Sequence, residues 1–127
     1  MSRIKICGLR RPEDIAAVNE ARPDYCGFIV EYPKSRRSID RTTLRELVRG
    51  LREKIVPVGV FVNAPKELVA ELLEEGTIQI AQLHGQESQE YIQELKVLTE
   101  KPLIQAFSIK SKEDVERARE SVADYIL

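Results

Sequence analysis

The most constraining feature of the sequence is a regular alternation of short strand patterns with longer helix patterns. The strand patterns are brief runs of β-branched and aromatic residues, and the helix patterns repeat apolar residues every three or four positions. The predicted strands are 3–7, 24–30, 55–62, 78–83, 103–109 and the segment ADYIL that begins at Ala123. The predicted helices are 12–21, 40–54, 65–75, 88–99 and 111–120, with Asp40 and Ser88 as candidate caps at the starts of the second and fourth. This order predicts a parallel sheet with right-handed crossovers.

Two α/β architectures satisfy this order. The strand starts, near residues 4, 24, 55, 78, 103 and 124, have a mean spacing of about 24 residues. An open, doubly wound sheet could be complete within 127 residues. A (β/α)8 TIM barrel would need about 190 residues at this spacing, so 1–127 would be a single partial domain with about five and a half of its units. Length favours the open sheet, whereas the motifs described below favour the barrel.

Composition excludes several classes of partner. The chain has 20 Lys and Arg against 21 Asp and Glu, so it has no overall positive field for nucleic acid or an anionic membrane. No apolar run approaches the roughly 20 residues that span a bilayer, and the first eight residues lack the apolar core of a signal peptide. We therefore expect a cytoplasmic protein that binds neither nucleic acid nor membrane. Cys7 and Cys26 are expected to be free thiols, without the partners that a zinc site needs.

Residues with chemical potential follow the predicted strands. In both architectures the carboxyl ends of the strands and the loops after them form the functional edge. The residues at these positions are Cys7-Gly8, the basic segment 31–37, Asn63, His84-Gly85 and Ser108. The sequence therefore predicts that they lie along one rim.

Cys7 has two interpretations at this rim. Lys5 shares its strand face by the period of two, and a nearby ammonium favours the thiolate, which is a base and a nucleophile. A free cysteine is also commonly a small buried filler. From the residues alone both remain open, whereas Cys26, inside a strand, is predicted to belong to the core.

The other rim residues also have two possible interpretations each. Arg36 and Arg37, with Lys34 beside them, suit either an anion site, since a guanidinium matches a carboxylate or phosphate, or a solvated basic loop. Gln82 and His84 share a strand face and could line a pocket, although a structural hydrogen-bonding role is equally compatible.

Four motifs taken in order add specificity to this pattern. KICGL, DYCGFIVEYPKSRRSI, VGVFVN and AQLHGQE resemble the phosphoribosylanthranilate isomerase family of tryptophan biosynthesis, and the resemblance covers the whole chain. It implies a TIM barrel and an Amadori rearrangement of a small phosphorylated substrate. It implies no cofactor.

The resemblance also implies residue roles. Cys7, in the family's KICG motif, would be the general base, and Arg37 would hold the anthranilate carboxylate. Arg36 occupies a more variable position in the same stretch. Gln82 and His84 would line the pocket, and Asn63, which ends VGVFVN, is a further candidate for substrate binding.

The end of the chain limits these expectations. In the family the general-acid aspartate ends the sixth strand, and the loops after strands seven and eight hold the phosphate. Asp124 begins the predicted sixth strand and should face the other end of the barrel, so it does not take the acid role. We expect an isolated chain of this extent to be inactive and to form a homo-oligomer through exposed strand edges.

A noncatalytic regulatory domain with a doubly wound sheet is the alternative function. Such a domain would need acidic residues at the ends of the first and third strands. Those ends contain Cys-Gly and Val-Asn instead. A third possibility is a truncated protein that folds and self-associates but catalyses no reaction.

Overall fold

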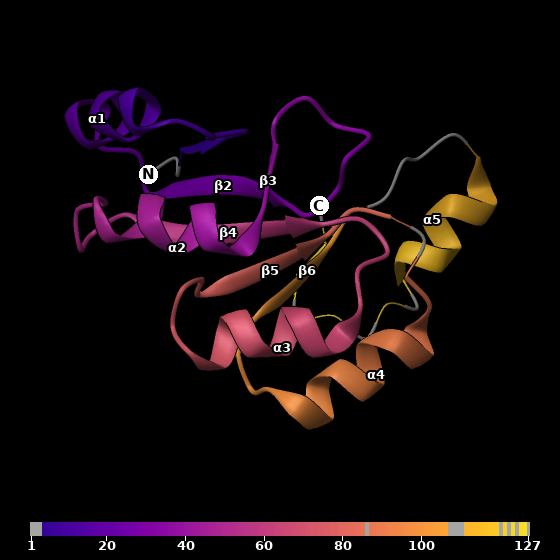
Figure 1. Cartoon of the computed structure of the whole chain (residues 1–127). Coiled ribbons are helices and arrows are strands. Elements are labelled where there is room, and N and C mark those ends of the chain that lie inside the picture. The colour runs from indigo at the N-terminus through magenta and orange to yellow at the C-terminus, as the bar shows by residue number, and fades with distance from the viewer. Residues whose placement is uncertain are drawn as a thin grey trace.

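The computed structural model describes residues 4–85, 87–106, 111–119, 121, 123 and 125–126, and Figure 1 shows the arrangement of their helices and strands. The strands are β1 (Lys5–Cys7), β2 (Tyr25–Val30), β3 (Ser38–Ile39), β4 (Val56–Phe61), β5 (Ile80–Leu83), β6 (Leu103–Gln105) and β7 (Tyr125–Ile126). The helices are α1 (Pro12–Ala21), α2 (Arg41–Arg49), α3 (Lys66–Glu74), α4 (Gln89–Leu98) and α5 (Lys112–Arg119).

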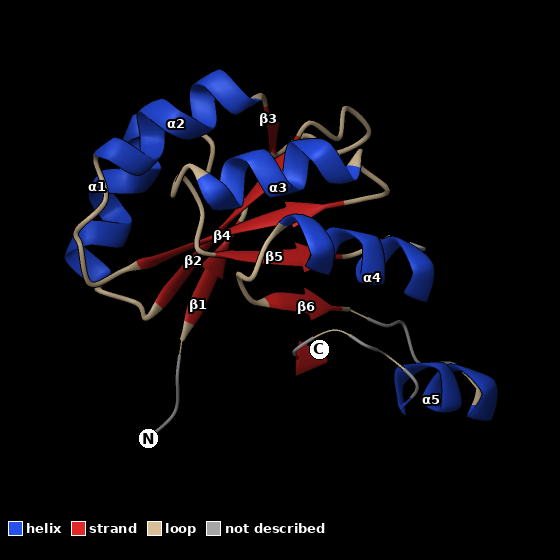
Figure 2. Cartoon of the chain, turned by 90° about the horizontal axis from the view of Figure 1, so that it is seen from below, coloured by secondary structure: helices blue, strands red, loops and turns tan. Residues whose placement is uncertain are grey.

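The strand order distinguishes the two predicted architectures. All pairings are parallel, and the strands run β1-β2-β4-β5-β6-β7 across the sheet, with the short β3 beside β2. A doubly wound sheet reverses its strand order at a switch point, and this order never reverses. Figure 2 shows α1 to α4 gathered on one side of the curving strands. The open doubly wound alternative is therefore wrong, and the prediction of a partial barrel is confirmed.

The core lies between the strands and this helix layer. The strands contribute the fully buried side chains Cys26, Phe28, Val30, Phe61, Ala81, Leu83 and Leu103. The helices contribute Leu44, Val69, Leu72, Leu73, Ile92 and Leu95, which are equally buried. Because side chains alternate between the faces of a strand, the residues between these positions point to the inner side of the curved sheet. The inner side is where Cys7 and Gln82 are found.

Two helix starts have side-chain caps that the sequence indicated. The Asp40 carboxylate accepts a hydrogen bond from the Thr43 N–H at 2.7 Å, and Ser88 Oγ accepts one from the Tyr91 N–H at 3.0 Å. Each bond satisfies a backbone donor that the first turn of a helix leaves unpaired. The bonds to Thr43 also hold the pKa of Asp40 below its ordinary value.

The helix predicted over 40–54 is shorter in the structure, where α2 ends at Arg49. The cause is a residue of another helix. The Asn19 side chain of α1 donates to the Gly50 carbonyl at 2.8 Å and accepts from the Arg52 N–H at 3.0 Å. These two bonds take up the backbone groups that would continue α2, so the chain turns there toward β4.

Two further boundaries differ from the prediction. The segment after β2 contains the two-residue strand β3, whose residues pair with Ile29 and Val30 and which the sequence pattern missed. The strand predicted over 103–109 is present as β6 over Leu103–Gln105, and 107–110, with Ser108, lie outside the described residues. Asp124 also lies outside them.

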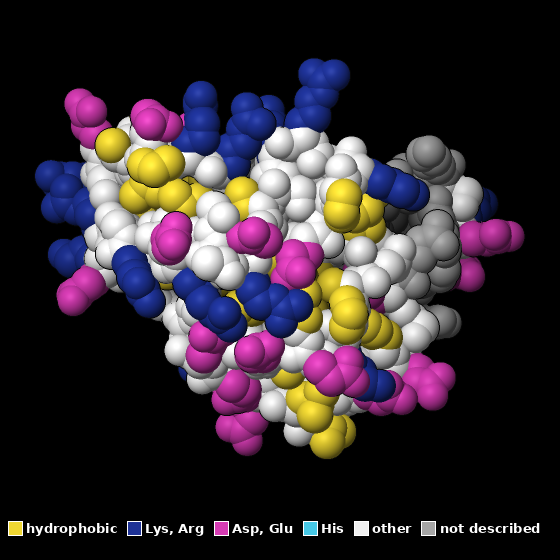
Figure 3. Space-filling model, in the orientation of Figure 1, with side chains coloured by type: hydrophobic (Ala, Val, Ile, Leu, Met, Phe, Trp, Pro, Cys, Tyr) yellow, Lys and Arg dark blue, Asp and Glu magenta, His cyan; other side chains and the backbone are white. Residues whose placement is uncertain are grey.

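Ion pairs link the outer faces of neighbouring helices. Arg45 of α2 contacts Glu75 at 2.8 Å and Glu71 at 3.4 Å, and Arg41 contacts Glu71 at 3.5 Å and Glu31 at 2.9 Å. Figure 3 shows acidic and basic side chains interspersed over this face. Because all of these side chains remain partly exposed, solvent screens the pairs and each contributes little alone. No described helix has both the length and the apolar character needed to cross a membrane.

The burial of a side chain predicts how much its replacement by alanine lowers the stability of the protein. Leu83→Ala removes a fully buried side chain of β5, and we expect it to lower the free energy of unfolding by about 2–5 kcal/mol. Val97→Ala truncates a side chain that is 85% exposed on α4 and should change it by less than about 0.5 kcal/mol. Urea denaturation measures both, and equal losses would contradict this description of the core.

Candidate active site

Parallel pairing brings the ends of four strands to one rim, as the sequence predicted. Cys7 ends β1, the segment 31–37 follows β2, Asn63 follows β4 and His84 follows β5. The chain leaves three of these strands through left-handed backbone conformations, at Gly8 (φ 85°), Glu31 (φ 46°) and Asn63 (φ 51°).

Cys7 is exposed, so it is not the small buried filler that the sequence left open. Its thiol lies over Gly27 of β2, where an added Cβ would be 2.7 Å from Cys7 Sγ and 3.1 Å from Lys5 Cε. The missing side chain at Gly27 therefore makes room for both residues. Cys26 is buried, as predicted, and burial first, with the neighbouring Cys7 second, raises the pKa of its thiol to about 12. Cys26 therefore stays protonated at neutral pH.

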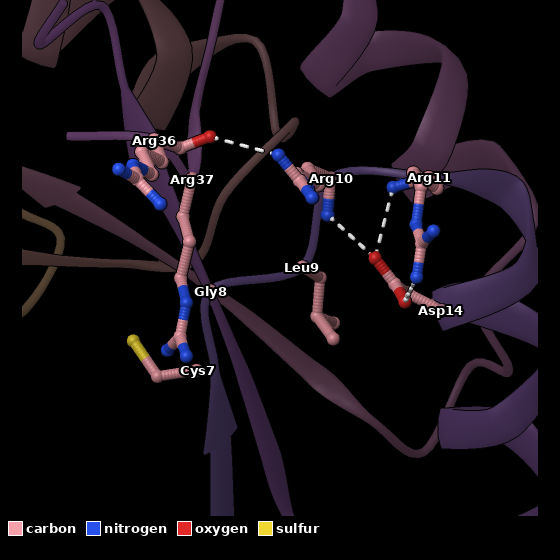
Figure 4. A pocket seen from close by; sticks show the side chains of 8 residues that line it. All are labelled: Cys7, Gly8, Leu9, Arg10, Arg11, Asp14, Arg36 and Arg37. Atoms are coloured by element: carbon pink, nitrogen blue, oxygen red, sulfur yellow. Dashed lines mark hydrogen bonds and ion pairs between the residues drawn. The ribbon is translucent and has the colours of Figure 1, made fainter.

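Arg37 reaches the same place from the loop after β2. A Cβ at Gly8 would lie 2.6 Å from Arg37 Cδ and 3.0 Å from Nη1, so the arginine side chain lies across Gly8. Figure 4 shows its guanidinium beside Cys7. The structure thus brings together the thiol and the guanidinium that the sequence singled out separately.

Lys5 also extends along the inner side of the sheet. Its ammonium donates a hydrogen bond to Gln82 Oε1 of β5, across two intervening strands. Gln82 is 4% exposed, and its Nε2 lies 3.3 Å from Nδ1 of the exposed His84, so the amide can donate to that ring nitrogen when it is unprotonated. Gln82 and His84 therefore share a face, as predicted.

Glu87 is a rim residue that the sequence analysis missed. It is 6% exposed, and its carboxylate accepts hydrogen bonds from the Asn63 N–H at 2.8 Å and the Gly85 N–H at 2.9 Å. A buried carboxylate needs such donors, and these two come from the loops after β4 and β5. A Cβ at Gly85 would be 2.7 Å from Asn63 Oδ1. Glu87 thereby holds the loops that carry Asn63 and His84 against each other.

A pocket of about 430 Å³ opens at the ends of β1 and β2. It is lined by Cys7, Gly8, Leu9, Arg10, Arg11, Asp14, Arg36 and Arg37 (Figure 4). Four arginines and only one acidic residue line the pocket, so it suits an anionic ligand. Arg10, Arg11 and Asp14 were not singled out from the sequence. Gln82, His84 and Asn63 do not line this pocket and lie further along the rim.

Asp14 organises the loop after β1. Its Oδ2 accepts hydrogen bonds from the backbone N–H groups of Arg10 and Arg11, both at 3.1 Å. The bond from Arg10 is the main cause that holds the pKa of Asp14 below its ordinary value. Arg11 adds an ion pair through Nη2 at 3.4 Å.

The pocket can support proton transfer beside a bound anion. A thiol at its mouth can exchange a proton with a ligand, and the guanidinium groups can hold a carboxylate next to it. Among the described residues, no group of three or more His, Cys, Asp or Glu side chains is placed to hold a metal ion.

Comparison with known proteins gives a consistent result. The family model for N-(5'-phosphoribosyl)anthranilate isomerase matches residues 4–127. The N-(5'-phosphoribosyl)anthranilate isomerase of Caldanaerobacter subterraneus is 42% identical over 127 residues, which are 100% of this chain and 60% of that protein.

Solved structures agree with the sequence match. A phosphoribosylanthranilate isomerase in complex with reduced 1-(o-carboxyphenylamino)-1-deoxyribulose 5-phosphate has a TM-score of 0.81 at 34% identity, over 93% of this chain and 59% of that one. A structure of monomers of the dimeric enzyme from Thermotoga maritima has a TM-score of 0.80 at 34% identity, with the same coverage of 93% and 59%.

The chain spans about 60% of the length of the curated relative. Within that span, the family model, the sequence identity and the TIM-barrel fold of the neighbours confirm the resemblance that the four motifs suggested. The chain belongs to the phosphoribosylanthranilate isomerase family.

Proposed function

We propose that this chain takes part in the isomerisation of N-(5-phosphoribosyl)anthranilate to the corresponding 1-deoxyribulose 5-phosphate in tryptophan biosynthesis. The observation that carries the proposal is the meeting of Cys7 and Arg37 across Gly8, at the mouth of a cationic pocket. The substrate has a carboxylate on an aromatic ring that is joined through nitrogen to the first sugar carbon, so the carboxylate lies a few bonds from the second carbon, which loses a proton. A base beside a carboxylate-binding group matches that arrangement.

In the proposed reaction Cys7 acts on the open-chain form of the sugar. Opening of the ribose ring needs a proton on the ring oxygen and leaves an iminium group at the first sugar carbon. The Cys7 thiolate then removes a proton from the second carbon, and the electron pair of that C–H bond neutralises the iminium nitrogen. The resulting enolamine becomes the ketone on tautomerisation. These steps only move protons, so they consume no redox cofactor.

Arg37 would hold the anthranilate carboxylate through its two-pronged guanidinium. Arg36, which lines the same pocket, would add positive charge. Gln82, His84 and Asn63 would form the wall of the substrate site further along the rim. Glu87 holds the loops of Asn63 and His84 together there. Ring opening needs a separate acid, and this role is assigned to none of the described residues.

We place the protein in the cytoplasm. The two free cysteines suit a reducing compartment, which supports this location.

Cys7 is tested in a protein in which residues 1–127 are joined to the part of the Caldanaerobacter relative that they do not cover. We expect Cys7→Ala to lower kcat by about 10²–10⁴-fold, the usual contribution of a positioned general base. The measurement is the rate of substrate conversion, followed spectroscopically. Cys26→Ala, which removes the other thiol, should retain activity within a few fold. Undiminished turnover by Cys7→Ala would show that another group is the base.

Arg37 is tested in the same joined protein. Arg37→Met removes the guanidinium, and we expect KM to rise by about ten- to a hundredfold, as for loss of a charge-assisted bond of roughly 1.5–3 kcal/mol. Arg37→Lys should recover only part of this, because an ammonium cannot bind a carboxylate with two parallel bonds. Arg49→Met, on the exposed end of α2, is the control. An unchanged KM in Arg37→Met would exclude the carboxylate role.

We also propose that the chain forms homo-oligomers through an exposed sheet edge. Among the described residues β1 pairs only with β2, and inner-face side chains such as Tyr25, Val56 and Ile104 are only partly buried. An unpaired strand edge favours pairing with another chain. The related Thermotoga maritima enzyme, described as dimeric, is consistent with association in this family.

Ile4 tests this edge because it lies next to β1 and is 60% exposed. We expect the chain to sediment as a dimer or larger species at micromolar concentration, and Ile4→Lys to shift it toward monomer by placing a charge at the edge. Val97→Lys adds the same charge at a site that is 85% exposed on α4 and should leave the association unchanged. A monodisperse monomer in analytical ultracentrifugation of the unmodified chain would contradict the proposal.

A further inference from the structure

Arg10 lines the pocket, and the proposed reaction gives it no role. Its guanidinium donates a hydrogen bond through Nη1 to the Arg36 carbonyl oxygen at 3.0 Å (Figure 4). The bond links the loop after β1 to the loop after β2. The Arg11 guanidinium, by contrast, pairs with Asp14 in its own segment.

The accepting carbonyl has a particular position in the chain. It belongs to the peptide bond that joins Arg36 to Arg37, so the contact fixes the backbone from which the Arg37 side chain begins. The other hydrogen bonds of segment 32–37, within the described part of the chain, have both partners inside 32–38. Among the described hydrogen bonds, the one from Arg10 is therefore what ties this segment to the β1 side of the pocket.

The donating end is anchored as well. The Asp14 carboxylate, in the first turn of α1, accepts hydrogen bonds from the backbone N–H groups of Arg10 and Arg11. The backbone at Arg10 is thus attached to a helix rather than to a second free loop. A continuous set of contacts runs from α1 through Asp14 and Arg10 to the peptide group that precedes Arg37.

We propose that Arg10 is a positioning residue that fixes the Arg37 backbone, so that the Arg37 guanidinium stays across Gly8 and beside Cys7. This inference rests on the proposed function of Arg37 as the carboxylate-binding group. Without the bond, the segment 32–37 would keep its internal turn but lose its attachment to the opposite loop. Arg37 would then have to be ordered by the ligand, and part of the binding free energy would be spent on that ordering.

The test measures ligand affinity by isothermal titration calorimetry in the same joined protein that is used to test Cys7 and Arg37. The probe is reduced 1-(o-carboxyphenylamino)-1-deoxyribulose 5-phosphate, and a second probe lacks the carboxylate. We expect Arg10→Met to raise Kd for the first probe by roughly three- to tenfold, the range for one ordinary hydrogen bond, because solvent exposure weakens the contribution of the charged donor. Arg10→Lys retains a donor of similar reach and should recover most of the affinity. For the probe without the carboxylate, Arg10→Met should change Kd by less than about twofold.

The decisive comparison is a double-mutant cycle with Arg37→Met. If Arg10 acts through Arg37, adding Arg10→Met to the Arg37→Met chain should change Kd by less than about twofold. Additive losses would overturn the proposal, because they would mean that Arg10 contributes independently of Arg37. Loss of affinity in Arg10→Met that disappears at 0.5 M salt would also overturn it, since only a long-range charge effect is screened in this way.

Two controls separate the positioning role from its alternatives. Arg11→Met removes a charge from the same pocket without touching the bond to Arg36, and we expect a smaller effect that salt abolishes. Arg49→Met, outside the pocket, should leave Kd unchanged. If Arg37→Met itself leaves Kd unchanged, or if the unmodified joined protein binds neither probe, the proposed function fails and the inference fails with it. If Arg37→Met weakens binding and Arg10→Met does not, only the positioning role fails.

Discussion

Parallel hydrogen bonding from β1 through β5 determines where every candidate functional residue lies. In a parallel sheet all strands end at the same edge, so residues far apart in the sequence become neighbours simply by following their strands. The register pairs Cys7 with Gly27 and Val60 with Gln82. A shift of one residue in either pairing would turn the inward side chains toward the helix layer, where the core is already filled. The packing of the core therefore also fixes the composition of the pocket.

Charged residues are arranged differently at the ends of β1 and β2 and at the ends of β4 and β5. At the ends of β1 and β2, guanidinium groups outnumber carboxylates and the pocket remains open to solvent. At the ends of β4 and β5, one buried carboxylate, that of Glu87, is satisfied by two backbone donors. The first arrangement leaves positive charge available for a ligand, and the second uses its charge internally to hold loops together. The cationic pocket and the buried carboxylate that holds the loops thus occupy neighbouring but separate parts of the rim.

Much of the fold could be predicted from the sequence, because its periodicity is local. The strand and helix patterns, the caps at Asp40 and Ser88, and the rim positions of Cys7 and Arg37 all follow from spacing along the chain. The end of α2 could not be predicted, since it depends on Asn19 of another helix. Glu87 resembles an ordinary charged residue before a helix, and only the structure shows that it is buried. Arg10 was missed for a similar reason, because its partner belongs to a different loop.

The two cysteines occupy opposite faces of adjacent strands, and this difference has a consequence for oxidation. Cys26 is fully buried and holds its proton, so oxidants and electrophiles are excluded from it. Cys7 is exposed at the mouth of the pocket. Oxidative chemistry on this chain would therefore concentrate on the sulfur proposed as the base. An oxidised Cys7 can no longer accept the proton, so catalysis and damage would compete for the same atom.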